Sequence, residues 1–216
     1  MKVSPLSFEL RQKQEGEGDE DDGLFGLIPS PLLSKIIHSM ALSEPRQALL
    51  QMLIAAHAMT DEQAKQACAE IEAHWNESPG DLNEAFKAIN VALKMMNLEI
   101  RSTNERGVLV HTMINLTDDD IATKWGTKMT ASDMDVFKKV VRRIGSSNSS
   151  DDGDVEAKFV HYDKFDKSEQ NVIMQMVGNK WLHLDGTSVS VAARSRLELP
   201  EFLEANGIPR SQVIYH

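Results

Sequence analysis

The stretch "VIMQMVGNKWLHLDGTSVSV" (172–191) predicts a helix that ends at a glycine and continues directly into a two-stranded hairpin. The apolar face of the helical half consists of Val172, Ile173, Met176 and Val177. In the second half, Asp185-Gly186 is a turn signal between two segments whose apolar residues point to the same side. A helix with a hairpin at its end is the last part of a winged helix, a fold that often reads DNA. This helix, however, carries almost no positive charge.

A similar order of elements occurs earlier in the chain. Apolar periodicity predicts helices near 45–58, 60–75 and 82–96, followed by a hairpin of alternating residues in 98–116. A further helix is capped near Thr130 and is assigned to the same domain. Its inward residues are Met134, Phe137, Val140, Val141 and Ile144. Three helices and a hairpin predict a first winged helix.

The predicted fold is therefore mainly α with small β-hairpin wings, arranged as tandem winged-helix domains. Residues 1–44 form an acidic disordered tail with a short amphipathic helix, and 45–147 form the first winged helix. Residues 148–156 are an acidic linker, and 157–216 form the second winged helix. The segment 145–165 is short for the first helices of a complete second domain.

Charge and composition exclude few partners. The formal net charge is -10, but the acidic stretches at 15–22 and 151–156 hold ten of the 33 acidic residues. Without 11–22 and 151–156 the chain has 23 acidic and 21 basic residues, so net charge excludes neither DNA nor a protein. No stretch suits a membrane span or a signal peptide, which predicts an intracellular protein without a membrane partner.

The sequence contains no catalytic or metal-binding constellation. The single cysteine, Cys68, lies on the apolar face of its helix, and the seven histidines lack metal-ligand spacing. The carboxylates of "TDDDIA" (117–122) are explained by a helix start. We therefore expect a binding module that is not an enzyme and holds no cofactor.

Two groups of residues are candidate contacts. Cations that could hold DNA phosphate are Lys138, Lys139, Arg142, Arg143 and Lys180, although cations near a helix C-terminus are favoured in any case. Residues that could contact a protein partner are Leu32, Leu33, Ile36, Ile37 and Met40 of the tail helix, with Trp181 and His183 near the second hairpin. Docking on its own domain is the more frequent role of such a tail helix, and a tryptophan such as Trp181 is more often a core residue than a contact residue.

Several phrases, in order, resemble a known family. They include "RQALLQMLIAAHAMT" (46–60), "VHTMINLTDDDIATK" (110–124) and "GNKWLHLDGTSVSVAARSRLEL" (178–199). Over about 45–216 the chain resembles the non-SMC element one subunit of the SMC five/six genome-maintenance complex. The resemblance implies a nuclear protein that pairs with a MAGE-family subunit (non-SMC element three) and a kleisin subunit (non-SMC element four). Together these support DNA repair and chromosome segregation.

Members of that family also carry a C-terminal zinc-binding variant RING domain linked to ubiquitin ligase activity. The sequence stops at "QVIYH", about where its first cysteine pair is expected, so zinc is expected only beyond this chain. We expect a scaffold subunit that docks on the MAGE-family partner and contacts DNA weakly or jointly with its partners. The alternative is a free-standing winged-helix DNA-binding transcriptional regulator.

Overall fold

The computed structural model describes residues 42–117, 130–147 and 158–216, which form a mixed α/β fold with small antiparallel sheets. We call residues 42–117 the first module. Its elements are α2 (Glu44–Ala56), β1 (Ala58–Thr60), α3 (Asp61–Trp75), α4 (Leu82–Leu93), the 3₁₀ turn η1 (Lys94–Met96), β2 (Leu98–Glu105) and β3 (Val108–Asn115). This order is compatible with a winged helix, as the sequence predicts.

Local sequence explains where these elements begin and end. Thr60 Oγ1 accepts a hydrogen bond from the backbone N–H of Gln63, and Gln63 Oε1 accepts one from the backbone N–H of Thr60, which completes a capping box. Asp81 caps α4 in a similar way. At the tip of the β2–β3 hairpin, Arg106 and Gly107 both have positive φ, as a tight turn of this hand requires.

The second module consists of residues 130–147 and 158–216. Its elements are α6 (Ala131–Ser146), β4 (Val160–His161), η3 (Tyr162–Lys164), α7 (Lys167–Gly178), β5 (Leu182–Asp185), β6 (Ser188–Val191), α8 (Ala193–Glu198), α9 (Pro200–Ala205) and β7 (Val213–Tyr215). The opening stretch of the sequence is thus α7, β5 and β6, in agreement with the predicted helix and hairpin. Between β4 and α7 lies only the short turn η3.

Helix α6 corrects the sequence-based assignment. The prediction that it completes the first domain is wrong, because its buried residues pack with α7 and the β5–β6 hairpin. The shared core contains Phe137 and Val141 of α6 together with Ile173, Trp181 and Val189. The amphipathic pattern of α6 showed which face is buried but not which core it completes. The first module has its own separate cluster, centred on α2, α3 and α4.

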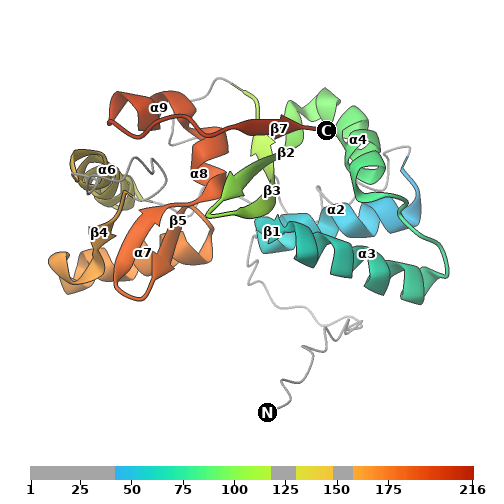
Figure 1. Cartoon of the computed structure of the whole chain (residues 1–216), viewed down its shortest axis with the longest axis horizontal. Helices are drawn as coiled ribbons and strands as arrows, with labels where there is room; N and C mark the ends of the chain where they lie inside the picture. The colour runs from blue at the N-terminus through green and yellow to red at the C-terminus, as the bar shows by residue number, and fades with distance from the viewer. Residues whose placement is uncertain (1–41, 118–129, 148–157) are drawn as a thin grey trace, which may run out of the picture.

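The last strand joins the two modules. One sheet has the order β1-β3-β2-β7 and the other β4-β6-β5. Strand β7 follows the elements of the second module, yet it pairs antiparallel with β2 of the first (Figure 1). Helix α8 also packs against β2 and β3. The C-terminal segment therefore belongs to both modules.

Part of the predicted organisation lies outside the described residues. This applies to residues 1–41, which include the predicted tail helix from Leu32 to Met40, and to the whole of the predicted 148–156 linker. Within the described ranges, no helix is long and apolar enough to cross a membrane.

Candidate functional site

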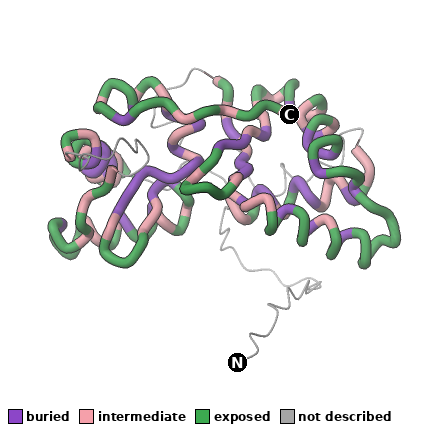
Figure 2. Tube along the Cα trace, in the orientation of Figure 1, coloured by how far each residue is buried: buried purple, intermediate pink, exposed green. Residues whose placement is uncertain are grey.

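The buried polar side chains gather where the two modules meet. In the described part of the chain, every one of them lies on β2, β3, β6 or α8. They are Ser102, Thr103, His111, Thr112, Ser190, Ser195 and Glu198. Figure 2 shows buried stretches in the middle of the molecule, between the two apolar cores. The junction is thus held by hydrogen bonds, as interfaces between domains often are.

The tip of the β2–β3 hairpin is one of these contacts. The Glu105 carboxylate accepts a hydrogen bond from the backbone N–H of Ala193, at the start of α8, at 3.1 Å. Arg106 donates to Asp185 at 3.0 Å and to the Ser190 hydroxyl at 3.1 Å. Burial raises the pKa of the Glu105 carboxyl, although nearby cations oppose the shift. The wing of the first module is therefore docked on the second module.

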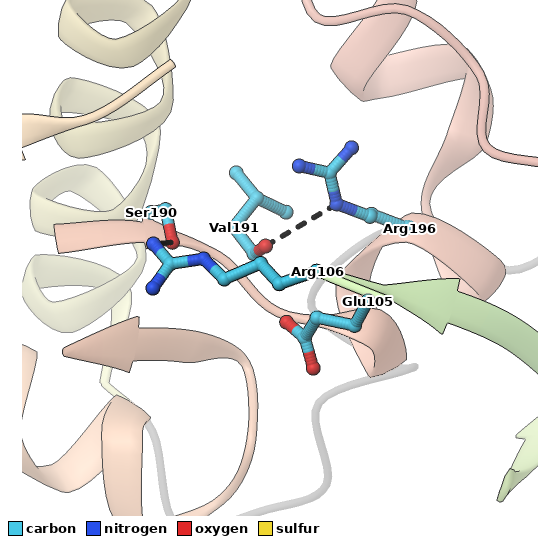
Figure 3. Close-up of a pocket in the computed structure, with 5 residues that line it drawn as sticks. All are labelled: Glu105, Arg106, Ser190, Val191 and Arg196. Atoms are coloured by element: carbon cyan, nitrogen blue, oxygen red, sulfur yellow. Dashed lines mark hydrogen bonds between the residues drawn. The ribbon is translucent and has the colours of Figure 1, made fainter. Parts of the chain in front are cut away.

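A small pocket lies beside this contact. Glu105, Arg106, Ser190, Val191 and Arg196 line it (Figure 3). Its free volume of about 10 Å³ holds roughly one water molecule. In Figure 3 Arg106 reaches from the end of β2 towards Ser190, and Arg196 bonds to the Val191 carbonyl. The pocket is too small for a metabolite and forms part of the junction.

A chain of hydrogen bonds attaches the end of β7 to the first module. Ser102 Oγ lies 2.6 Å from His111 Nδ1 and 2.6 Å from His216 Nε2. His111 Nε2 lies 3.3 Å from Asp61 Oδ1. One proton assignment satisfies every bond: His216 Nε2–H donates to Ser102, Ser102 donates to His111 Nδ1, and His111 Nε2–H donates to Asp61. Both imidazoles are neutral in this arrangement, and burial lowers the pKa of each.

Ser102, His111 and Asp61 have the residue types of a hydrolase triad, but their setting differs from a catalytic one. Ser102 is fully buried, with a relative exposure of 0%. A nucleophile must reach a substrate carbonyl, and Ser102 Oγ is already shared between two imidazoles. We therefore assign the network a structural role. Among the described residues, no group of three or more His, Cys, Asp or Glu could hold a metal ion.

A third histidine makes the junction sensitive to pH. His57 ends α2, and its pKa is lowered from 6.5 to about 4, chiefly by burial and then by the charges of Arg194 and Lys180. Below pH 6.5 the unfolded chain binds a proton at His57 that the folded chain refuses until about pH 4. Stability must therefore fall as the pH falls through this window. His111 and His216 act in the same direction.

Because of His57, we expect the unfolding free energy to be about 1 kcal/mol lower at about pH 5 than at about pH 7.5. This figure is reduced to allow for the partial exposure of the side chain. Urea unfolding at the two pH values measures this loss. The variant His57→Asn cannot titrate and suits the left-handed backbone at φ 62. Its pH dependence should be weaker than that of the native chain. Equal dependence in both proteins would exclude His57 as the cause.

The predicted DNA contacts do not form one free patch. Lys139 forms an ion pair with Glu169 of α7. Arg143 donates to the Lys164 carbonyl at 3.2 Å and lies 4.8 Å from the Phe165 ring centroid. Lys138 is half-buried and Arg142 is exposed on the same helix. Two of the four cations on α6 thus hold the second module together.

The residues predicted near the second hairpin also differ in setting. Trp181 is 1% exposed and lies in the core of the second module, so its predicted role as a surface contact is wrong. The Arg194 guanidinium lies over its ring, 4.1 Å from the centroid. His183 is half-buried, whereas Lys180 is exposed and has a positive φ of 62°.

Sequence reasoning missed the junction because its parts are far apart in the chain. Glu105 and Ala193 are separated by 88 residues, and Ser102 and His216 by 114. Turn chemistry places Arg106 at a hairpin tip, but nothing in the sequence shows what the tip contacts. The available signal was a pair of polar residues in each strand, Ser102-Thr103 in β2 and His111-Thr112 in β3.

Comparison with protein families agrees with this architecture. The family model described as "Nse1 non-SMC component of SMC5-6 complex" matches residues 46–161, more than half of the chain. This chain belongs to the Nse1 family. The match spans the first module and extends into the second, through α6 to β4. As an Nse1-family member the chain is a non-SMC component of the SMC5-6 complex.

A solved structure has a similar fold. It is a chain from a structure described as "Nse1-Nse3-Nse4 complex", with a TM-score of 0.60 and 18% sequence identity. The alignment covers 73% of this Nse1-family chain and 72% of the solved one. At this identity the likeness shows the fold alone. A search of curated proteins found no match.

Proposed function

We propose that this Nse1-family chain is a scaffold subunit that docks on a MAGE-family Nse3-type subunit and, with a kleisin Nse4-type subunit, forms a module that engages DNA. In this proposal the chain acts in the nucleus, in DNA repair. DNA contact is secondary and shared with its partners. The residues of this chain catalyse no reaction and hold no cofactor. The observation that carries the proposal is the fold likeness to a chain solved in an assembly with Nse3 and Nse4.

The fold in this proposal is a tandem winged helix. The first unit is α2 to β3. The second consists of α6, β4, α7, β5 and β6, with the turn η3 in the position of the second helix. This arrangement explains why 145–165 looked short for two helices, because α6 supplies the first helix from an earlier part of the sequence.

The elements that read DNA in other winged helices are occupied here by contacts within the chain. This supports a scaffold over a free-standing DNA-binding protein. A reading winged helix presents its wing and third helix to the grooves and phosphates. Here the first wing binds the second module through Glu105 and Arg106. In α7 the Gln170 amide donates to the carbonyls of Tyr162 and Phe165, so it is not free to read a base.

Co-expression tests the proposal. The full chain is produced with an Nse3-type MAGE subunit, with and without the Nse4-type kleisin, and the mass of each complex is measured by size exclusion with light scattering. We expect a stable one-to-one complex with the MAGE subunit. Separate elution, combined with strongly salt-dependent binding of duplex DNA by the isolated chain, would contradict the scaffold and favour the DNA-binding regulator.

A further inference from the structure

Helix α4 carries an apolar stripe on the side that faces away from its own core. Val91 is 76% exposed, and Met95, one turn later in η1, is 93% exposed. Residues four apart on a helix are neighbours, so the two side chains lie on one ridge. Leu116, 43% exposed, lies at the same end of α4, because its backbone N–H bonds to the Asn97 carbonyl at 2.7 Å.

The charged residues nearest to the stripe are two lysines, and Glu84 lies one turn before the first of them. Lys87 precedes Val91 by one turn and Lys94 is adjacent to Met95, and both lysines are exposed. The inner face of α4 is already occupied, because Phe86 and Ile89 are buried in the first core and Asn90 bonds to both backbone groups of Ile100 in β2. The exposed ridge therefore contributes nothing to the packing of its own module.

Helix α3 of the same module shows what an ordinary exposed face looks like here. Its exposed residues are mostly polar or small: Glu62, Gln63, Lys65, Gln66, Ala69, Glu70, Glu72, Ala73, His74 and, at its C-terminal end, Trp75 at 38%. Polar residues of this kind keep a face in water, whereas an exposed apolar ridge bordered by polar residues marks an interaction site. Helix α3 thus has one partly exposed large apolar residue, whereas α4 and η1 present two that are far more exposed and only one turn apart.

The geometry points to a protein-docking surface on α4 that receives an amphipathic helix of a partner, with its apolar stripe on Val91 and Met95 and its carboxylates opposite Lys87 and Lys94. This inference rests on the proposed function. A convex ridge with i, i+4 spacing fits the groove of another helix. Positive flanks select an acidic border on that helix. Duplex DNA fits the ridge poorly, because valine and methionine cannot hydrogen-bond to base edges and Glu84 repels phosphate.

The test compares surface variants within the assembled complex. The double variant Val91→Asp, Met95→Asp places two charges on the ridge. Because both sites are highly exposed, the isolated variant should have the same unfolding temperature as the native chain. The matched control is Met174→Asp on α7, another exposed methionine, at 47%. We expect the ridge variant to bind the co-expressed Nse3-type and Nse4-type subunits at least about tenfold more weakly, and the control to bind normally. Lys87→Glu with Lys94→Glu should weaken binding most at low salt.

The outcomes separate this inference from the proposed function. If the native chain binds neither subunit, the proposed function fails. If the native chain binds and the ridge variant binds equally well, only the docking surface is overturned. Two other occupants of the ridge are also distinguishable. Loss of self-association of the isolated chain, with unchanged complex formation, assigns the ridge to a second copy. Increased hydrogen exchange in 24–42 or 118–129 of the isolated ridge variant, again with normal complex formation, would mean that a segment of this chain covers the ridge. Either of these two results contradicts the inference.

Discussion

Replacing Trp181 by alanine should remove about 3–5 kcal/mol from the unfolding free energy of the second module. The indole is 1% exposed among α6, α7 and the β5–β6 hairpin, and its removal leaves a large cavity. Arg194 would also lose the ring that it covers at 4.1 Å. Urea unfolding followed by far-UV circular dichroism measures the loss without relying on the fluorophore that has been removed.

The control for this variant is Trp75→Ala. Trp75 lies at the end of α3 and is 38% exposed, so the loss should be clearly smaller. The sequence left open whether Trp181 belongs to the core or to a partner surface, and the measurement on the isolated chain distinguishes the two. A Trp181→Ala chain that keeps native stability but loses its partner would restore the surface assignment.

Replacing Gly145 by alanine should also destabilise the chain strongly, by about 3 kcal/mol or more. In the interior of a helix this substitution normally stabilises by roughly 1 kcal/mol. Here the sign is reversed, because a Cβ at Gly145 would lie 1.6 Å from the backbone oxygen of Asn206. The contact is between two backbones, and Lys158 fixes it by donating to the carbonyls of Gly145 and Gly207. Thermal and urea unfolding of the variant measure the effect.

Gly178→Ala is the matched control for Gly145→Ala. Gly178 also occupies the last turn of a helix, α7, but no atom lies within 4 Å of its added Cβ. We expect this variant to be neutral or slightly more stable than the native chain. If Gly145→Ala behaved in the same way, the close approach of α6 to the segment at Asn206 would be wrong.

Much of the local structure was predictable because it depends on neighbours in sequence. The β2–β3 hairpin and the turn at Asp185-Gly186 were predicted and are observed. The helix predicted near 60–75 is observed as α3, which begins at the capping box of Thr60 and Gln63. Gly145 lies shortly before the predicted linker at 148–156. In the structure it belongs to the last turn of α6.

The candidate contacts were less predictable because charge on a helix does not show what faces it. Lys139 and Arg143 read as outward cations, but the second module provides Glu169 and the Lys164 carbonyl opposite them. The apolar ridge of Val91 and Met95 was missed for a different reason. These two apolar residues adjoin the apolar residues that α4 buries, so the sequence pattern does not show that they are exposed. Only the exposure of each side chain in the folded structure separates a buried stripe from a second, exposed one.

By itself the sequence determined the helices α2, α3, α4, α6 and α7, the two hairpins and the face that each helix buries, because periodicity and capping are properties of neighbouring residues. The short elements β1, β4, α8, α9 and β7 were not predicted. The phrases shared with the Nse1 family added the identity of the complex. Tertiary structure alone decided that α6 completes the second core, that β7 adds to the first sheet and that the first wing is docked. An apolar face is compatible with any complementary core, and a three-residue strand with any open sheet edge, so these choices depend on the packing of the whole chain.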